Sequence, residues 1–269
     1  MQLRPDWVPE TIDVEQPSAA RIYDYLLGGS HNFAADRDVA RQAIAAMPDV
    51  PVQAHANRAF LRRAVQYLAE AGVRQFLDIG SGIPTLGNVH DVARQAAPGA
   101  RVVYVDLDPV AVAHSRAILA GTDRVTVIQE DLRHPTGILG HPDLKAVLDL
   151  DAPVAVLLVA ILHVIPDGDD PYRIVSALRD ALAPGSWLAI AHGTDDSRPA
   201  EVEELRRLSQ KTATPLTLRS RAEVQRFFAG WDLVEPGLVW APQWHPDSPD
   251  DVGEHPELSS NLVGLGRTK

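Results

Sequence analysis

The sequence predicts an α/β domain in which a mostly parallel, doubly wound sheet carries helices on both faces. Short and almost wholly apolar runs alternate with helical patterns, and a glycine-containing loop follows the first run directly. The expected strands are residues 75–79, 102–106, 124–128, 154–159 and 186–191. Apolar runs of this length separated by helices are typical of parallel βαβ units, whose strands are buried on both faces.

The N-terminal quarter of the chain differs from this alternating pattern. Residues 1–16 are polar and contain proline, which predicts an extended arm. The next segment is predicted to hold three helices, the first capped by Ser18 and the second by Asp36. The expected organisation is an arm with a helical region over residues 1–72, followed by an α/β domain over residues 73–269.

The remaining elements follow from local signals. Helices are expected at residues 89–96, 109–119 and 171–182, and closing strands at 231–240 and 261–266. Residues 193–217 are polar and predict a helix with a mobile loop. Ser220 and Glu223 form a capping-box pattern that predicts a further helix start. Residues 242–257, rich in proline, aspartate and histidine, predict a surface loop.

Composition excludes several classes of function. The chain of 269 residues has no cysteine, so disulfides, thiolate catalysis and cysteine-bound metals are ruled out. The formal net charge of −11 disfavours broad binding to nucleic acid or to anionic lipid. No apolar stretch approaches the roughly 20 residues that a membrane-spanning helix needs. No signal peptide or metal-binding histidine pair is predicted, and a cytoplasmic location is expected.

The strongest local signal for a ligand is Asp78-Ile-Gly-Ser-Gly82, at the end of the first strand. Glycines at this point let a ligand approach the backbone closely. A dinucleotide fingerprint would place a third glycine at position 85, where this chain has Thr85 after Pro84. Asp78 would repel a diphosphate but suits a cationic ligand such as S-adenosylmethionine (SAM). A plain strand-to-helix turn remains the alternative.

Acidic residues also follow the next two strands. Asp106 lies 24 residues beyond Gly82, where a carboxylate can accept hydrogen bonds from ribose hydroxyls. Asp108 is better explained as the cap of the following helix. Within Glu130-Asp131-Leu132, a carboxylate can accept from an adenine amino group while Leu132 covers the ring; a polar turn explains it equally well. Three acids on three strand ends together predict a site for a cationic nucleoside.

Two histidines follow the fourth and fifth strands. His163 would face the reacting centre and could take a proton from a hydroxyl or amine of the methyl acceptor. It could equally be a packed or helix-capping residue. His192 is the weaker candidate of the two. The sequence therefore names His163 as the candidate catalytic residue without excluding the structural alternative.

These motifs resemble those of the class I SAM-dependent methyltransferases, which have a Rossmann-like fold. More narrowly, the chain is similar to an actinobacterial S-adenosyl methyltransferase family. The wider resemblance rests on Phe76–Gly82, Val105-Asp106 and Glu130-Asp131, and the narrower one on Pro17–Phe33, Ala56–Phe60, Gly80–Thr85 and Leu162-His163. The resemblance implies a seven-stranded sheet with a reversed final strand.

The resemblance also implies a function and a set of contacts. It implies transfer of a methyl group from SAM to a small-molecule acceptor, which it does not identify. An N-terminal helical lid and the segment 195–215 would close over the cofactor. The expected cofactor residues are Asp78, Gly80, Ser81, Gly82, Asp106, Leu107, Asp131, Leu132 and Ala160, with Tyr23, Gly29, His31 and Asn32 from the lid. Pro84 departs from the third loop glycine common in the superfamily.

Two other functions share parts of this pattern. A nicotinamide-dependent oxidoreductase would use the same sheet and Asp106, but it would gain nothing from Asp78. A protein that binds SAM as a sensor or assembly partner would need no catalytic base. The sequence gives neither the acceptor nor the oligomeric state.

Overall fold

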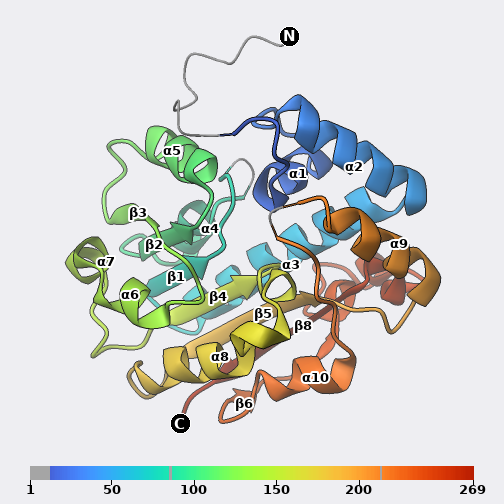
Figure 1. The fold of residues 1–269 in the computed structure, drawn as a ribbon. Helices are drawn as coiled ribbons and strands as arrows, with labels where there is room; N and C mark the ends of the chain where they lie inside the picture. The colour runs from blue at the N-terminus through green and yellow to red at the C-terminus, as the bar shows by residue number, and fades with distance from the viewer. Residues whose placement is uncertain (1–12, 85–86, 213) are drawn as a thin grey trace.

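A single twisted sheet forms the centre of the molecule (Figure 1). The computed structural model describes residues 13–84, 87–212 and 214–269. The strands follow the order β3-β2-β1-β4-β5-β8-β6, and β7 also pairs with β8. Their bounds are β1 Gln75–Ile79, β2 Arg101–Asp106, β3 Val125–Gln129, β4 Ala155–Val159, β5 Trp187–Gly193, β6 Asp232–Leu233, β7 Val239–Trp240 and β8 Asn261–Arg267.

The pairing confirms the expected mostly parallel sheet. Strands β1 to β5 pair in parallel, whereas β8 runs antiparallel to β5 and to both short strands. Every residue of β1 and of β4 is buried. Strands covered by helices on both faces need apolar side chains at every position, which is why these runs show no polar alternation.

Helices cover both faces of the sheet (Figure 1). Side chains of α3, α4 and α5 share one hydrophobic cluster with the sheet, and those of α6, α7 and α8, with Phe227 and Phe228 just after α10, share the other. The helix bounds are α1 Ala19–Leu26, α2 Ala34–Ala46, α3 Val50–Glu70, α4 Val89–Ala96, α5 Pro109–Ile118, α6 Pro135–Gly140, α7 Pro142–Val147, α8 Pro171–Asp180, α9 Pro199–Ser209 and α10 Arg221–Arg226. The expected N-terminal helical region is therefore present.

The start of α2 corrects the expected role of Asp36. The helix begins after Phe33, and Asp36 lies in its first turn rather than at the cap. The buried Asp36 carboxylate accepts the backbone N–H of Phe33 at 2.8 Å and that of Ser18 at 2.9 Å. It also pairs with Arg21 at 3.0 Å. Asp36 thus ties α1 to α2 as well as closing the first turn of its own helix.

Two expectations for the C-terminal part are wrong. Residues 231–240 form two-residue strands, β6 and β7, instead of one strand, because Pro236 has no N–H to donate and Gly237 turns the chain with φ +83°. The segment 242–257 is only partly a surface loop. Trp244 within it is fully buried and packs edge-on against Phe60 of α3, with ring centroids 5.3 Å apart.

The helices α1, α2 and α9 lie away from the two sheet layers, on one side of the molecule (Figure 1). Helix α2 packs against both α1 and α9. An ion pair of 2.8 Å between Arg198 and Asp49 joins the start of α9 to the start of α3. Across the described part of the chain, no helix combines the length and hydropathy that a membrane crossing requires.

Candidate functional site

A cavity of about 800 Å³ opens at the carboxyl ends of β1, β2 and β4. The glycine loop after β1 and the ends of β2 and β4 form its floor, and α1, α2, α3 and α9 contribute its walls. Open α/β sheets bind ligands at this edge, outside the carboxyl ends of the strands. Its volume is near the upper end of the roughly 300–1,000 Å³ of single-ligand pockets, so it has room for two small molecules.

The glycine loop has little freedom to change. The N–H groups of Gly80 and Ser81 both donate to the carbonyl of Val105, at 2.8 and 3.1 Å, which holds the loop against β2. Gly80 has φ +74°, and a Cβ there would come within 2.6 Å of the Ile161 side chain. Gly82 has φ +63°, but a Cβ on it would meet no atom within 4 Å. Position 80 therefore requires glycine because a larger residue would clash with Ile161, and position 82 requires it because of the backbone conformation.

Asp106 is fixed at the end of β2 by two backbone donors. Its carboxylate accepts the N–H of Gly82 at 2.7 Å and the N–H of Asp108 at 2.8 Å. The side chain is only 8% exposed, and this burial raises the pKa of the Asp106 carboxyl to about 6 despite the two hydrogen bonds. Each carboxylate oxygen has a further lone pair, which hydroxyl groups of a ligand can use.

Asp78, near the end of β1, is buried like Asp106, but no backbone hydrogen bond to its carboxylate is seen among the described residues. It is 4% exposed, and burial raises the pKa of its carboxyl to about 7. The positive charge of Arg58, on α3, lowers the pKa, whereas the neighbouring Asp106 raises it further. Asp78 has no ion-pair partner within 4 Å in the described part of the chain; burying such a carboxylate is unfavourable, so its retention here is typical of a site that binds a cation.

Asn57 adds an unused hydrogen-bond acceptor to the same cavity. The Tyr23 hydroxyl donates to the carbonyl of Ala54 at 3.0 Å and therefore accepts from Asn57 Nδ2 at 2.8 Å. This fixes the orientation of the Asn57 amide. Among the described residues, its Oδ1 has no hydrogen-bond partner and is buried. An orphaned acceptor that lines the same cavity as two buried carboxylates fits the amino group of SAM.

Asp131 differs from the other two acids because it has an ion-pair partner. It lines the cavity, but its carboxylate is bound by Arg133 at 2.6 Å. Burial raises the pKa of Asp131, and the hydrogen bonds from Arg133 outweigh this effect, so its pKa lies below the usual range. Leu132, beside it, is buried and also lines the cavity. A hydrogen bond from adenine to Asp131 remains a prediction.

His163 lies in a short 3-10 turn after β4 and lines the cavity. Its Nδ1 accepts the backbone N–H of Gly193 at 3.1 Å. Burial, together with the charge of Arg219, lowers the pKa of His163 to about 4. The ring is therefore neutral at pH 7. His192 is fully buried behind it, outside the cavity lining, and accepts from Arg219 through Nε2 at 3.0 Å.

The structure brings most of the sequence-predicted cofactor residues together. Those that line the cavity are Asp78, Gly80, Ser81, Gly82, Asp106, Leu107, Asp131, Leu132, Ala160 and Tyr23. Gly29, His31 and Asn32 do not line it. They surround the buried Asp24, whose Oδ2 accepts from His31 N at 2.8 Å and from Asn32 Nδ2 at 2.9 Å. Thr85, at the position of the missing loop glycine, lies outside the described residues.

Sequence reasoning missed Arg58 and Asn57 as cavity residues. Both lie on α3, whose other cavity-facing positions include the apolar Ala54 and Leu61. The sequence signal that could have identified them is the presence of two polar residues on a helix face that is otherwise largely apolar. Arg219, which organises the turn around His163, was also missed because it lies far along the chain. In the described ranges, no cluster of three or more histidine and acidic side chains is placed to hold a metal.

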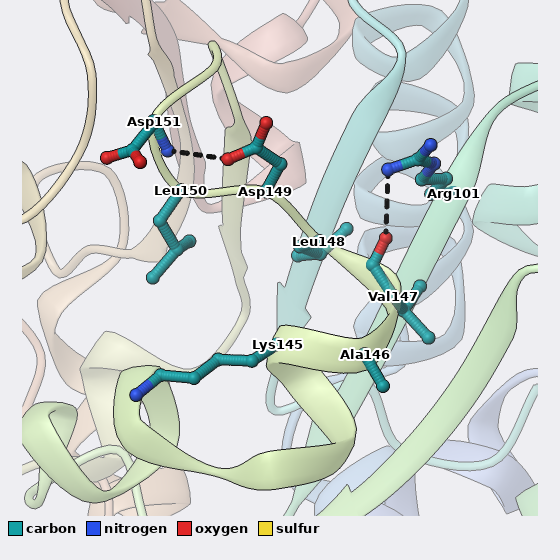
Figure 2. A pocket seen from close by; sticks show the side chains of 8 residues that line it. All are labelled: Arg101, Lys145, Ala146, Val147, Leu148, Asp149, Leu150 and Asp151. Atoms are coloured by element: carbon teal, nitrogen blue, oxygen red, sulfur yellow. Dashed lines mark hydrogen bonds between the residues drawn. The ribbon is translucent and has the colours of Figure 1, made fainter.

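A second, shallower cavity of about 380 Å³ lies at the amino-terminal edge of the sheet (Figure 2). It is lined by Arg101, at the start of β2, and by residues 145–151. Arg101 Nη1 donates to the carbonyl of Val147 at 3.5 Å, and the Asp151 N–H donates to Asp149 at 3.0 Å. Its charged side chains are exposed to solvent, so it lacks the buried carboxylates of the larger cavity.

The fold and the large cavity define a class of protein. The sheet is parallel except for the strands at one edge, a glycine loop follows β1, and an acid ends β2. The loop and the buried Asp78 fit a cationic nucleoside better than a diphosphate. These features together are those of a class I SAM-dependent methyltransferase.

Comparison with known proteins identifies the family. The model of the S-adenosyl methyltransferase family matches residues 5–269, and the chain belongs to this family. It is therefore a SAM-dependent methyltransferase, and neither a nicotinamide-dependent oxidoreductase nor a SAM-binding protein without activity is supported. A comparison with curated protein sequences finds no match.

Solved structures agree with this assignment. A DUF574 family protein from Streptomyces avermitilis MA-4680 is 41% identical, with a TM-score of 0.92 over 96% of this chain and 99% of that one. A candidate methyltransferase from Thermobifida fusca YX is 42% identical, with a TM-score of 0.91 over 98% and 99% of the two chains.

A more distant structure shares the fold alone. The N-methyltransferase NodS from Bradyrhizobium japonicum WM9, solved with S-adenosyl-L-homocysteine (SAH), is 15% identical. Its TM-score is 0.51, over 92% of this chain and 98% of NodS.

Proposed function

We propose that the large cavity holds SAM at its acidic end and an apolar small molecule, the methyl acceptor, at its other end. The observation that carries the proposal is the burial of Asp78 and Asp106, at 4% and 8% exposure, beside one cavity. Both carboxyls have a raised pKa because they are buried, and a bound cation would offset that cost.

At the acidic end, each group of SAM has a suitable partner. Asp106 would accept the ribose hydroxyls, and Gly80, Ser81 and Gly82 would lie against the sugar and the methionine part. Asp78 and Asn57 Oδ1 would accept from the amino group, and Arg58 would pair with the carboxylate. Leu107, Asp131 and Leu132 would surround the adenine, and Ala160 and Tyr23 would complete the pocket. All of these residues line one cavity.

The other end of the cavity is aliphatic. Its apolar walls come from the N-terminal helices, from α9 and from the segment that follows α9. The aliphatic residues of this lining include Val39, Ala43, Met47, Val50, Leu61, Val202, Leu205, Leu208 and Leu218. Polar side chains such as Gln53, Thr212 and Thr214 also line the cavity, but walls rich in aliphatic side chains favour a molecule with a hydrocarbon body. We therefore propose a small apolar acceptor rather than a protein or nucleic acid.

The residues of the chain act mainly by position. When bound, SAM would supply an electrophilic methyl group, with the neutral thioether of SAH as the leaving group. The packing of α9 on α2 would keep water from this centre, and the strand ends would hold the two molecules in line.

A cytoplasmic location, expected from the sequence, remains a prediction that fractionation of cells can check.

Calorimetry with SAM, SAH and NADH tests the assignment of the site. We expect binding of SAM and SAH, no heat with NADH, and loss of SAH binding in Asp106→Asn. Lys145→Ala, at the opposite edge of the sheet, is the matched control and should bind SAH normally. Binding of SAH that survives both Asp78→Asn and Asp106→Asn would overturn the proposed site.

A second experiment tests the acceptor class. The enzyme is incubated with SAM carrying a labelled methyl group, separately with a small-molecule extract and with a protein extract. We expect label in organic-soluble products of the first mixture only. Label confined to protein would contradict the proposed apolar small molecule.

A further inference from the structure

We infer that His163 serves as a hydrogen-bond donor to the acceptor through its Nε2–H, and that the acceptor is a delocalised oxygen anion such as a carboxylate. The inference rests on the proposed function, because it assumes that the acceptor occupies the cavity next to His163. It differs from the sequence-based hypothesis, in which His163 takes a proton from a hydroxyl or amine.

The backbone contact of His163 decides the position of its proton. A backbone N–H can only donate, so the hydrogen bond of 3.1 Å from Gly193 N requires a lone pair on His163 Nδ1. In a neutral imidazole the proton is then on Nε2. Nδ1 is occupied by Gly193, and the ring lines the cavity, so Nε2–H is the group left for a ligand.

Arg219 fixes the turn that carries His163. It is 2% exposed, and it donates to the carbonyls of Leu162 and Ile165, each at 2.9 Å. These carbonyls belong to the residues on both sides of His163, so the arginine holds the turn at two points. The Thr217 N–H also donates to the His163 carbonyl at 2.7 Å. His163 is thus held from the backbone as well as through its ring.

The electrostatic surroundings also oppose a proton on Nδ1. Arg219 places a buried positive charge next to His163 and, together with burial, keeps the pKa of His163 at about 4. His192 packs edge-on against it with ring centroids 5.7 Å apart. Because His192 accepts from Arg219 through Nε2 and donates through Nδ1 to the Gly193 carbonyl at 2.6 Å, it is neutral as well. Asp167, the ion-pair partner of Arg219 at 2.6 Å, is mostly exposed.

A fixed donor restricts which acceptors can react. An alcohol or amine would need a base where His163 offers an N–H instead. A carboxylate needs none, since it is already ionised at pH 7. One of its oxygens can accept from Nε2–H while the other attacks: the new O–CH₃ bond forms, the C–S bond breaks, and the electron pair of that bond stays on sulfur. No proton is removed, and the product is a methyl ester.

The distribution of charge in the cavity agrees with an anionic acceptor. The buried carboxylates of Asp78 and Asp106 are at the cofactor end, whereas Arg219 gives a positive potential behind His163. A cationic donor and an anionic acceptor would therefore each meet groups of opposite charge. The aliphatic walls would hold the hydrocarbon part of the acid.

The proton position can be measured directly. Long-range ¹H–¹⁵N spectra of histidine-labelled protein report which ring nitrogen carries the proton, and the signals that His163→Gln removes identify His163. We expect protonated Nε2 and unprotonated Nδ1, without titration between pH 5.5 and 8.5. The opposite tautomer, or titration with a midpoint near 6.5, would overturn the inference.

The acceptor class is tested with probes of equal length. Octanoate, 1-octanol and octylamine are titrated into protein saturated with SAH, and we expect octanoate to bind at least about tenfold more tightly than the others. Equal binding of the three, a preference for the alcohol or amine, or no octanoate binding would contradict the inference. Failure of SAH itself to bind would instead contradict the proposed function.

Two substitutions separate a donor from a base. His163→Gln keeps an N–H near the position of Nε2 but cannot act as a base, whereas His163→Leu has neither property. We expect Gln to preserve the octanoate affinity within about threefold and Leu to lose about tenfold or more. His255→Gln, at an exposed histidine that does not line the cavity, is the matched control. Equal losses in Gln and Leu, with SAH binding intact in both, would show that an N–H donor is not what the site uses.

Discussion

The two edges of the sheet both place charged side chains beside a hollow, but they treat those charges differently. At the amino-terminal edge, Arg101, Lys145 and Asp149 are exposed to water (Figure 2). At the carboxyl-terminal edge, Asp78 and Asp106 are almost completely buried. Exposed charges cost little, whereas a buried carboxylate lowers stability unless a ligand or partner offsets the cost. Burial of charge, rather than the presence of a hollow, therefore marks the edge that functions.

The largest expected effect is at Asp106. Asp106→Asn keeps the shape of the side chain but removes the charge, and one of its two backbone donors then faces an N–H. We expect the affinity for SAH to fall by about 100-fold or more, as is usual when charged hydrogen bonds to a ligand are lost. Calorimetry measures the change. A loss smaller than about threefold would mean that this edge does not bind the ribose.

Asp78→Asn should separate binding from stability. We expect SAH affinity to fall by about 30-fold, and the free energy of unfolding of the ligand-free protein to rise by about 1–3 kcal/mol at pH 8. The folded-state pKa of about 7 lies above the unfolded value of about 4, so the carboxyl costs the folded state stability as pH rises from about 4 to about 7, and the full cost is present at pH 8. Urea unfolding at pH 8 and pH 4 checks this, since the gain should shrink toward pH 4. A loss of stability at pH 8 would contradict the raised pKa.

The affinity for SAM should depend on pH through the same carboxyl. If only ionised Asp78 binds the cation, affinity falls by about tenfold per pH unit from pH 7 to pH 6, because the competent fraction falls by that factor, and it falls more steeply below pH 6, where Asp106 is also protonated. Calorimetry from pH 5.5 to 8 would show this slope, with proton release on binding. The Asp78→Asn variant should show a flatter profile. An equally steep profile in the variant would assign the dependence to another group.

The smallest effect is expected at the opposite edge. Lys145→Ala and Asp149→Ala remove exposed charges and should change the free energy of unfolding by no more than about 0.5 kcal/mol. SAH affinity should stay within about twofold of the unsubstituted protein. Thermal unfolding and calorimetry measure both. A larger loss of SAH affinity from either substitution would remove the contrast between the two edges.

Much of the sheet could be predicted from the sequence because buried parallel strands have a strong signal. The apolar runs, the glycine loop and the acids at the carboxyl ends of β1, β2 and β3 all fall at expected positions, since each depends on a few neighbouring residues. The short helices α6 and α7 were not predicted. Each has six residues and starts at a proline, so neither offers the repeated apolar spacing by which longer helices are recognised.

The site was less predictable where it depends on contacts between distant segments. The charge of Arg58 acts on Asp78 only because α3 packs on the sheet. Arg219 binds the turn that carries His163 from a segment more than fifty residues further along the chain. The proton on His163 is set by the backbone of Gly193, which no motif encodes. Gly29, His31 and Asn32 belong to a polar motif that the sequence predicts to bind the cofactor, but none of them lines the cavity; His31 and Asn32 instead donate to one oxygen of the buried Asp24.

Several of the aliphatic residues that line the cavity come from α2, from α9 and from the segment that follows α9, rather than from the helices that cover the sheet. Helices α2 and α9 contribute no residue to the two clusters that bury β1 to β5, so their cavity-lining side chains can change size without disturbing the strand ends that carry Asp78 and Asp106. Selection for a new acceptor would then act on one set of residues while the methyl donor is retained by another. In this architecture the choice of what is methylated can evolve separately from the ability to methylate.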